Sequence, residues 1–391
     1  MSRERLARIS FAMREQVGKG IFPGAVTLII RHGEIVQFEA EGFQNAAKTK
    51  PMAKDSIFRL ASMTKPVTTA AAMILVEQGI IRLSDPISAY LPELKDLKIE
   101  SKGLDEDGKP IVADVPAKEP VRIYDLMRHT SGFFYANADT PEPLKRAYQT
   151  ANIEAPFNPI SADEMLKRLG QIPLAHQPGT TFHYSISTDV LGLLLERVTH
   201  KGLDQILYEL LIGPLGMKDT AFWVPASKAV RLAELPDGDS AKEQSLMFCR
   251  PENMVRQSYF KGGSGLCGTA EDYSTFLQMI VNKGDYKGRR YLSKKTVEFM
   301  LSDQTPGLPG STIGSTGPGY GFGLGFAVRL QDGVGWAAGT KGDAMWGGAF
   351  GTSFFIDPKE ELVAIQLTQG AKSRLESRLL FKNLVYAAIV Q

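Results

Sequence analysis

The order of helical and strand-like segments along the 391-residue chain predicts an α+β fold. Strand-like apolar runs occur near both ends of the chain, whereas the long stretch between them has helical apolar spacing. Helical patterns also open and close the chain. We therefore expect one sheet domain built from residues 1–61 and 221–391, with a mainly helical domain of residues 62–220 inserted into it.

The first 20 residues predict a surface helix, because Leu6, Ile9, Met13 and Val17 follow helical spacing. Charged residues interrupt this stretch, so it lacks the apolar core of a secretory signal. The chain also has no run of 18 uncharged apolar residues that would predict a membrane span. We therefore expect a cytoplasmic protein.

Residues 24–42 predict a β-hairpin with its turn at His32-Gly33, because Val36, Phe38 and Ala40 alternate with polar residues in the second strand. From residue 62 to about 220 the apolar spacing is mainly helical, as in residues 67–76 and 189–198. Polar, proline-rich loops are expected near residues 95–120 and 136–160.

Strand patterns return at residues 322–329, 350–356 and 361–368, after two glycine-rich segments. The last 20 residues predict a helix with a broad apolar face, formed by Leu375, Leu379, Phe381, Leu384, Val385 and Ala388. This closing helix completes the predicted sheet domain.

The composition excludes several classes of partner and site. Hydrophobic residues make up 43% of the chain, and 45 basic residues against 43 acidic ones give a formal net charge of +2. A net charge this close to zero predicts neither nucleic acid nor an anionic membrane as a partner. The sequence leaves the oligomeric state open. The two cysteines, Cys249 and Cys267, form no Cys-x-x-Cys pair, so we expect ordinary thiols rather than a disulfide framework or a zinc site.

The most informative short pattern is Ser62-x-x-Lys65, which lies just before an alanine-rich apolar helix. Residues three apart on a helix share one face, so the two side chains can meet. A serine hydroxyl becomes a good nucleophile when a neighbouring base takes its proton, and a lysine in a desolvated site can be that base. The unpaired N–H groups of a helix N-terminus can also stabilise an oxyanion.

A structural role for this pattern is the alternative, because Ser-x-x-Lys occurs a second time, at Ser258 to Lys261. The second copy runs into Gly262-Gly263-Ser264-Gly265 with no helix after it, which favours the first copy as the functional one. A Ser-His-Asp triad is disfavoured because no Gly-x-Ser-x-Gly occurs, and the five histidines form no zinc motif. His129 is expected to stabilise a turn rather than to act in catalysis.

Four stretches together resemble the serine β-lactamase and penicillin-binding-protein-like hydrolases. They are FRLASMTKP (58–66), LMRHTSG (126–132), PGTTFHYSISTDVLGLLLERVTHKGL (178–203) and PLGMKDTAF (214–222). The chain resembles in particular the carboxylesterases with the class C β-lactamase fold, called family VIII esterases. This resemblance covers nearly the whole chain and implies an antiparallel sheet flanked by helices, an inserted helical domain, and an active site between the two.

Residue by residue, the resemblance implies Ser62 as nucleophile, Lys65 as its partner and Tyr184 as a second proton-transfer residue. A tyrosine facing a lysine makes physical sense, since the cation stabilises a phenolate. The backbone N–H groups of Ser62 and Ala349 are the expected oxyanion hole. We expect Tyr135 to line the acyl pocket.

The sequence departs from the penicillin-recognising enzymes at two positions. Where those enzymes carry Lys-Thr-Gly, this chain has Trp346-Gly347-Gly348, which we expect to contact the substrate. Ile186 stands where class C β-lactamases have an asparagine. Both changes remove polar groups that would hold a β-lactam, so they favour an uncharged ester.

The expected function is therefore that of a serine carboxylesterase that hydrolyses small acyl esters and needs no metal or organic cofactor. A β-lactamase or D-amino-acid peptidase and an acyltransferase using the same acyl-enzyme are the alternative enzymes. A non-catalytic binding module is the remaining alternative, and the intact Ser62, Lys65 and Tyr184 argue against it.

Overall fold

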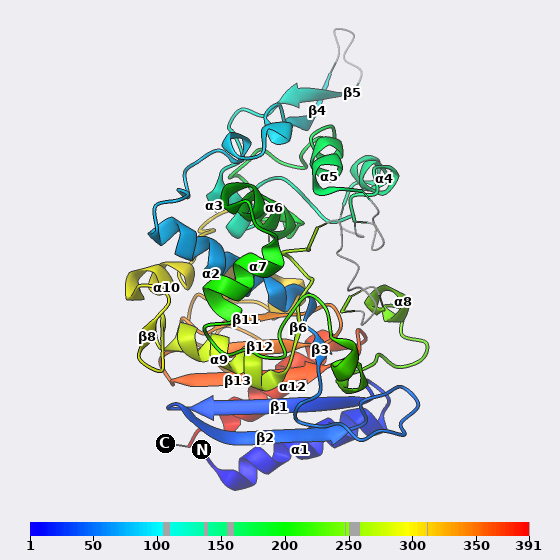
Figure 1. Cartoon of the computed structure of the whole chain (residues 1–391), viewed down its shortest axis with the longest axis vertical. Coiled ribbons are helices and arrows are strands. Elements are labelled where there is room, and N and C mark those ends of the chain that lie inside the picture. Colours follow the sequence, from blue (N-terminus) through cyan, green and yellow to red (C-terminus); the bar gives the residue numbers. More distant parts are fainter. Residues whose placement is uncertain are drawn as a thin grey trace.

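A seven-stranded antiparallel sheet forms the lower half of the molecule in Figure 1. The computed structural model describes residues 1–104, 110–136, 140–154, 160–246, 248–249, 259–310 and 312–390. The strand order is β2-β1-β13-β12-β11-β10-β9, so both chain ends contribute. The strands are β1 (Gly24–Arg31), β2 (Glu34–Gly42), β9 (Tyr320–Phe322), β10 (Ala327–Arg329), β11 (Ala344–Gly347), β12 (Ser353–Asp357) and β13 (Leu362–Thr368).

Helices cover both faces of this sheet. Neighbouring side chains of a strand point to opposite faces, and the ring of Phe354 contacts Tyr273 of α9 (Ala270–Val281) while Phe355 contacts Phe381 of α12 (Arg374–Ala387). The first helix, α1 (Arg3–Gly18), packs on α12, β1 and β2. The central strands are therefore buried from both sides, as in β13, where all seven residues are buried, whereas the edge strand β2 is mostly exposed or half-buried.

The middle of the chain forms the helical upper half of Figure 1. Its helices are α2 (Thr64–Glu77), α3 (Ile123–Met127), α4 (Glu142–Thr150), α5 (Ala162–Leu169), α6 (Ser187–Thr199) and α7 (Leu203–Leu207), which runs into a π-helical turn at Tyr208–Ile212. Short 3₁₀ turns lie at Ala61–Met63, Ile87–Ala89, Pro92–Leu94 and Ala226–Arg231. The remaining short helices are α8 (Lys242–Ser245), α10 (Lys294–Met300) and α11 (Ile313–Thr316).

The α+β prediction, the first and last helices and the N-terminal hairpin are confirmed. The loop expected near residues 95–120 is instead mostly a hairpin of β4 (Lys98–Leu104) and β5 (Pro110–Pro116). The run predicted as one strand at 322–329 is split into β9 and β10. A turn separates the two strands: the Gly323 amide donates to the Phe326 carbonyl at 2.8 Å, and Gly325 has a positive φ of 81° that favours glycine.

Two short sheets complete the described secondary structure, β3 (Phe58–Arg59) with β6 (Cys267–Gly268) and β7 (Asp285–Tyr286) with β8 (Arg289–Arg290). The β3–β6 pair joins the chain just before Ser62 to the segment that follows the second Ser-x-x-Lys. The domain boundaries at residues 61 and 220 stay a prediction. No helix in the described parts of the chain is long and apolar enough to cross a membrane.

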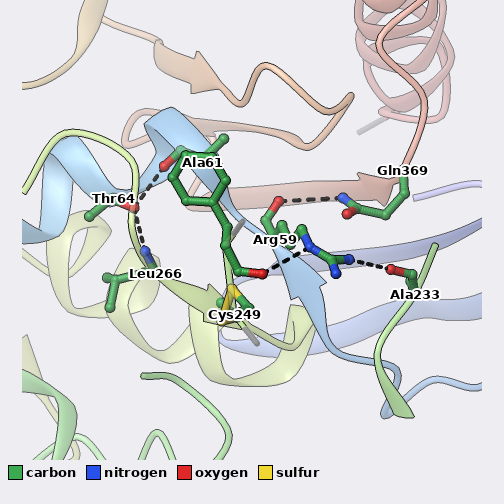
Figure 2. The surroundings of a disulfide bond; sticks show 9 residues. Arg59, Ala61, Thr64, Ala233, Cys249, Leu266 and Gln369 are labelled. Carbon is green, nitrogen blue, oxygen red and sulfur yellow. Dashed lines mark hydrogen bonds between the residues drawn. A yellow bond between two sulfur atoms is a disulfide. The ribbon is translucent and has the colours of Figure 1, made fainter. Parts of the chain in front are cut away.

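The expectation of two ordinary thiols is wrong, because Cys249 and Cys267 form a disulfide. The sequence pattern misses it because the two cysteines are 18 residues apart and meet only when the chain returns beside β6. Figure 2 shows the surroundings: the Arg59 guanidinium donates to the carbonyls of Ala233 (2.8 Å) and Phe248 (3.2 Å). Disulfides are uncommon in cytosolic proteins, so this bond does not support the expected cytoplasmic location. That location stays a prediction.

The buried face of the closing helix α12 is less apolar than predicted, because it also contains two cations, Arg378 and Lys382. Lys382 and Arg329 both contact the buried carboxylate of Asp343, each at 2.7 Å. Arg378 has no carboxylate in salt-bridge contact among the described residues. Helical spacing identifies these positions as inward-facing, but their charged residue types hide their burial.

Candidate active site

Ser62 lies where the sheet domain meets the helical part of the chain. The turn Ala61–Met63 leads directly into α2, and Ser62 is partly exposed to a cavity. Ala61 just before it has a left-handed backbone with φ 47°, a conformation that costs about 1–3 kcal/mol for a residue with a side chain. The hydroxyl of Thr64 donates to the Ala61 carbonyl and accepts from the Leu266 amide, which holds this turn (Figure 2).

Lys65 is fully buried, and its ammonium nitrogen lies 3.3 Å from the Ser62 hydroxyl oxygen. It also lies 2.9 Å from the Gly263 carbonyl oxygen and 3.1 Å from the Tyr135 hydroxyl. No carboxylate of the described chain is within salt-bridge distance. When neutral, the amine keeps two N–H groups for Gly263 and Tyr135, which leaves its lone pair for the proton of Ser62.

The two tyrosines are arranged differently from the sequence expectation. Tyr135, expected only to line the pocket, places its hydroxyl in contact with Lys65. Tyr184, expected to face Lys65, presents its ring face 4.6 Å from that nitrogen, and its hydroxyl accepts from the Trp346 indole N–H at 3.4 Å. Both tyrosines come from loops that only the folded chain brings over α2, so spacing alone could not assign these partners.

Asp189 orients Lys65 through a single residue, Gly263. Its carboxylate accepts from the Gly263 amide at 3.0 Å, and the Gly263 carbonyl accepts from Lys65. A Cβ at Gly263 would lie 2.9 Å from that carboxylate, so this close approach requires glycine. The sequence reasoning missed Asp189, although its position in the first turn of an apolar helix beside a glycine-rich partner is a recognisable signal.

The expected oxyanion donors Ser62 and Ala349 both line the cavity. The two glycines before Ala349 do not line it, in contrast to the sequence expectation. A Cβ at Gly347 would lie 2.4 Å from Arg378 Cζ, and one at Gly348 would lie 2.4 Å from the Leu60 carbonyl oxygen. These glycines therefore let the strand approach Arg378 and the nucleophile turn closely.

The cavity beside Ser62 has a volume of about 750 Å³. Its wall contains the aromatic side chains Tyr135, Phe182, Tyr184, Phe248, Tyr259, Trp346 and Phe350. Ile186, at the departure from the class C motif, also lines it. Of the second Ser-x-x-Lys, Ser258 lies outside the described residues, while Lys261 lines this same cavity. The lining thus combines aromatic side chains with polar ones, including charges at Glu154, Asp189, Lys261 and Arg374.

His129 packs behind Tyr184, with ring centroids 4.7 Å apart, and does not line the cavity. Burial, with a smaller effect of Lys65, lowers the pKa of His129 well below its ordinary value, so the ring is neutral. Its Nδ1 accepts from the Ser185 amide at 3.3 Å, and its backbone is left-handed with φ 58°. These contacts fit the expected turn-stabilising role. The described residues contain no cluster of His, Cys, Asp and Glu that could hold a metal ion.

Glu154 lines the cavity, and its charge depends on pH near neutrality. Burial raises its pKa to about 6, although the Ala136 N–H and Lys261 oppose the rise. The unfolded chain releases this proton at a pKa of about 4.3, so the native state holds more protons between the two values and loses stability as pH rises. Each pKa unit is worth about 1.4 kcal/mol, so we expect a loss of about 2 kcal/mol from pH 4 to pH 7 from this group.

The stability of Glu154→Gln relative to the wild type is therefore expected to increase by about 2 kcal/mol as pH rises from 4 to 7. Glutamine keeps an oxygen for the Ala136 N–H but carries no charge to bury. Urea unfolding of both proteins at half-unit pH steps measures this difference. A stability difference that stays constant over the range would contradict the assigned titration.

Comparisons with known proteins find a matching family and several similar proteins. The family described as Beta-lactamase matches residues 11–387. The chain is 35% identical over 364 residues to protein Rv1367c of Mycobacterium tuberculosis, covering 92% of this chain and 88% of that protein. It is 31% identical to the esterase EstB of Burkholderia gladioli, covering 97% and 95%. The solved structure of EstCE1, described as a hydrolase with promiscuous acyltransferase activity, matches with TM-score 0.78 and 27% identity over 99% of each chain.

Proposed function

The chain belongs to the Beta-lactamase family of serine hydrolases, and we propose that it is a carboxylesterase that cleaves small acyl esters through an acyl-enzyme on Ser62. The observation that carries this proposal is Trp346, which is buried and lines the cavity where penicillin-recognising enzymes carry a lysine. An indole favours an uncharged acyl or alcohol group at this position over a carboxylate.

The first half of the proposed reaction uses Ser62, Lys65 and the expected oxyanion donors. The Ser62 oxygen attacks the ester carbonyl carbon while neutral Lys65 takes the hydroxyl proton. The oxyanion that forms accepts from the Ser62 and Ala349 N–H groups. Lys65, now cationic, returns the proton to the departing alkoxide as the carbon–oxygen bond breaks, which releases the alcohol and leaves the acyl-enzyme.

The second half repeats these steps with water. Lys65 takes a proton from the attacking water, and the same proton later reaches the Ser62 oxygen as the carboxylic acid leaves. Burial, followed by the charge of Asp189, raises the pKa of Tyr135 well above its ordinary value, so this phenol stays protonated. Its oxygen accepts a hydrogen bond from Lys65, which leaves the lone pair of the neutral amine free for the Ser62 proton. Tyr184 borders the same space and is the second candidate for proton transfer to the leaving alcohol.

Two relatives support the proposal by their names, since EstB is an esterase and EstCE1 a hydrolase with promiscuous acyltransferase activity. An acyltransferase is the second candidate, because an alcohol can replace water as the acceptor of the same acyl group. The aromatic part of the cavity wall favours this alternative over a β-lactamase, since it offers an alcohol an apolar site beside Ser62.

The test is a substrate panel for the wild-type protein: p-nitrophenyl acetate, butyrate and octanoate, a chromogenic cephalosporin, and a D-alanyl-D-alanine peptide. We expect kcat/KM for the best ester to exceed that for the cephalosporin and the peptide by at least about 100-fold, which corresponds to about 2.7 kcal/mol of transition-state discrimination. Faster cephalosporin or peptide cleavage would overturn the proposal. Adding 1-butanol and measuring the butyl ester formed distinguishes transfer from hydrolysis.

A further inference from the structure

Arg378 of α12 has a buried guanidinium that donates hydrogen bonds to backbone carbonyls. It is 6% exposed, and its Nη2 donates to the Gly348 carbonyl at 2.6 Å and to the Thr352 carbonyl at 3.2 Å. Burial lowers its pKa to about 10, so it remains charged at neutral pH. Burying a charge without an opposite charge is unfavourable for folding, which leaves its presence unexplained by stability.

The contact with Gly348 fixes the direction of the next amide. In a trans peptide the C=O and the N–H of the same unit point in opposite directions, and the described chain has no cis peptide bond. Because the Gly348 oxygen points to Arg378 on α12, the Ala349 N–H points away from that helix. Ala349 lines the cavity together with Ser62, and no described residue accepts a hydrogen bond from its amide.

Further bonds connect this loop to the nucleophile. The Gly351 amide donates to the Gly348 carbonyl at 3.2 Å and closes a tight turn around Ala349. The Thr352 hydroxyl donates at 3.1 Å to the carbonyl of Leu60, two residues before Ser62. Arg378 therefore acts on a loop that is already joined to the nucleophile turn.

The glycine at position 347 is a second sign of the same arrangement. A Cβ there would lie 2.4 Å from Arg378 Cζ and 2.5 Å from its Nη2, so any side chain would displace the guanidinium. Gly347 has an ordinary backbone conformation, with no positive φ. Close packing of the guanidinium therefore explains this glycine better than a backbone requirement does.

We propose that Arg378 is a positioning residue for the oxyanion hole, which it serves by orienting and polarising the Gly348–Ala349 peptide. The positive charge draws electron density toward the Gly348 oxygen, which makes the Ala349 N–H a stronger donor. That N–H then faces the oxyanion that forms when Ser62 adds to a carbonyl. The inference rests on the proposed function in one respect, that the reaction passes through an oxyanion on a Ser62 adduct.

The test compares Arg378→Met and Arg378→Lys with Lys382→Met, a matched control that removes the other buried cation of the same helix. Lys382 contacts Asp343 and not the Ala349 loop. Active sites are counted by complete labelling with a fluorophosphonate, and kcat per labelled serine, KM and the inhibition constant of an alkylboronic acid are measured. The boronate forms a tetrahedral anion on the serine, so it reports on the oxyanion hole.

For Arg378→Met we expect kcat per labelled serine to fall on the order of 100-fold, the lower end of the effect of losing one oxyanion donor. KM should change little, and boronate affinity should fall in parallel with kcat. Arg378→Lys, which keeps the charge and one donor, should recover part of the loss. Lys382→Met should lower the melting temperature but keep kcat per labelled serine.

The proposal is overturned if Arg378→Met keeps kcat per labelled serine within threefold of wild type, or if Lys382→Met loses as much. Should Arg378→Met not fold, Gly347→Ala applies the same criteria, because its methyl group displaces the guanidinium without removing it. If the wild type cleaves no ester but is labelled at Ser62, the carboxylesterase proposal fails. The labelling rates of the variants then still decide the role of Arg378.

Discussion

The Ser62→Ala variant is expected to lose ester hydrolysis by about 10⁴- to 10⁶-fold in kcat, as in other hydrolases that lose a serine nucleophile. Alanine removes the oxygen that Lys65 contacts at 3.3 Å and leaves the rest of the site in place. The remaining activity would come from water attacking a bound ester near the oxyanion donors. Initial rates with p-nitrophenyl butyrate, corrected for spontaneous hydrolysis, measure this loss.

Fluorophosphonate labelling followed by intact mass and peptide mapping is the control for this variant. The wild type should gain one adduct at Ser62, and Ser62→Ala should gain none. Ser264 is the other serine to examine, because it lines the same cavity and belongs to the glycine-rich segment after the second Ser-x-x-Lys. An adduct at Ser264, or ester turnover by Ser62→Ala near the wild-type rate, would contradict the assignment of the nucleophile.

Contacts between residues close in sequence were the part of the site that could be predicted. Ser62 and Lys65 meet because the backbone turn fixes the positions of residues three apart, whatever the rest of the chain does. The N-terminal hairpin was predictable for the same reason, since its register follows from the turn at His32-Gly33. Local geometry thus gave the contact between Ser62 and Lys65 and the first two strands of the sheet.

Partners distant in sequence could not be assigned from spacing. Tyr135 and Tyr184 both enter the cavity, but which phenol contacts Lys65 depends on how two loops pack over α2. The link from Asp189 through Gly263 to Lys65 likewise joins three separate segments. The resemblance implied Ser62, Lys65 and Tyr184 as site residues, and these three lie close together. It did not give the hydrogen bonds that each of them makes.

Buried polar groups were the other feature that the sequence concealed. A helical pattern shows which face of α12 points inward, but a charged residue on that face is normally read as exposed. Gln37 of β2 shows the same effect: it is buried and donates to Ser10 of α1, while its apolar neighbours Val36 and Phe38 are only partly buried. Burial of such groups depends on a partner from another element, which a periodic pattern does not contain.

Replacing Lys65 by methionine is expected to lower kcat for ester hydrolysis by about 10²- to 10⁴-fold, the usual contribution of a positioned general base. Methionine fills a similar volume, so the packing around α2 is kept, but it cannot take the proton of Ser62. Fluorophosphonate labelling of Ser62 should slow in parallel, because it needs the same proton transfer. Stopped-flow rates of p-nitrophenol release and labelling time courses measure the two effects.

The stability of Lys65→Met separates loss of chemistry from loss of structure. Lys65 is a fully buried amine without a contacting carboxylate among the described residues, so its removal relieves the cost of desolvating a polar group. The Gly263 carbonyl loses its hydrogen bond, which opposes that gain by about 1–3 kcal/mol. We therefore expect a melting temperature close to that of the wild type, so that the kinetic loss belongs to the chemistry alone.

Lys65→Arg is the matched variant that separates a base from a fixed charge. Arginine keeps the positive charge beside Ser62 but stays protonated in proteins, so it cannot accept the serine proton. If Lys65 acts as the base, the arginine variant is as slow as the methionine variant at every pH. If Lys65 only supplies charge to the oxyanion, the arginine variant keeps most of the activity and the mechanism proposed for Ser62 is wrong.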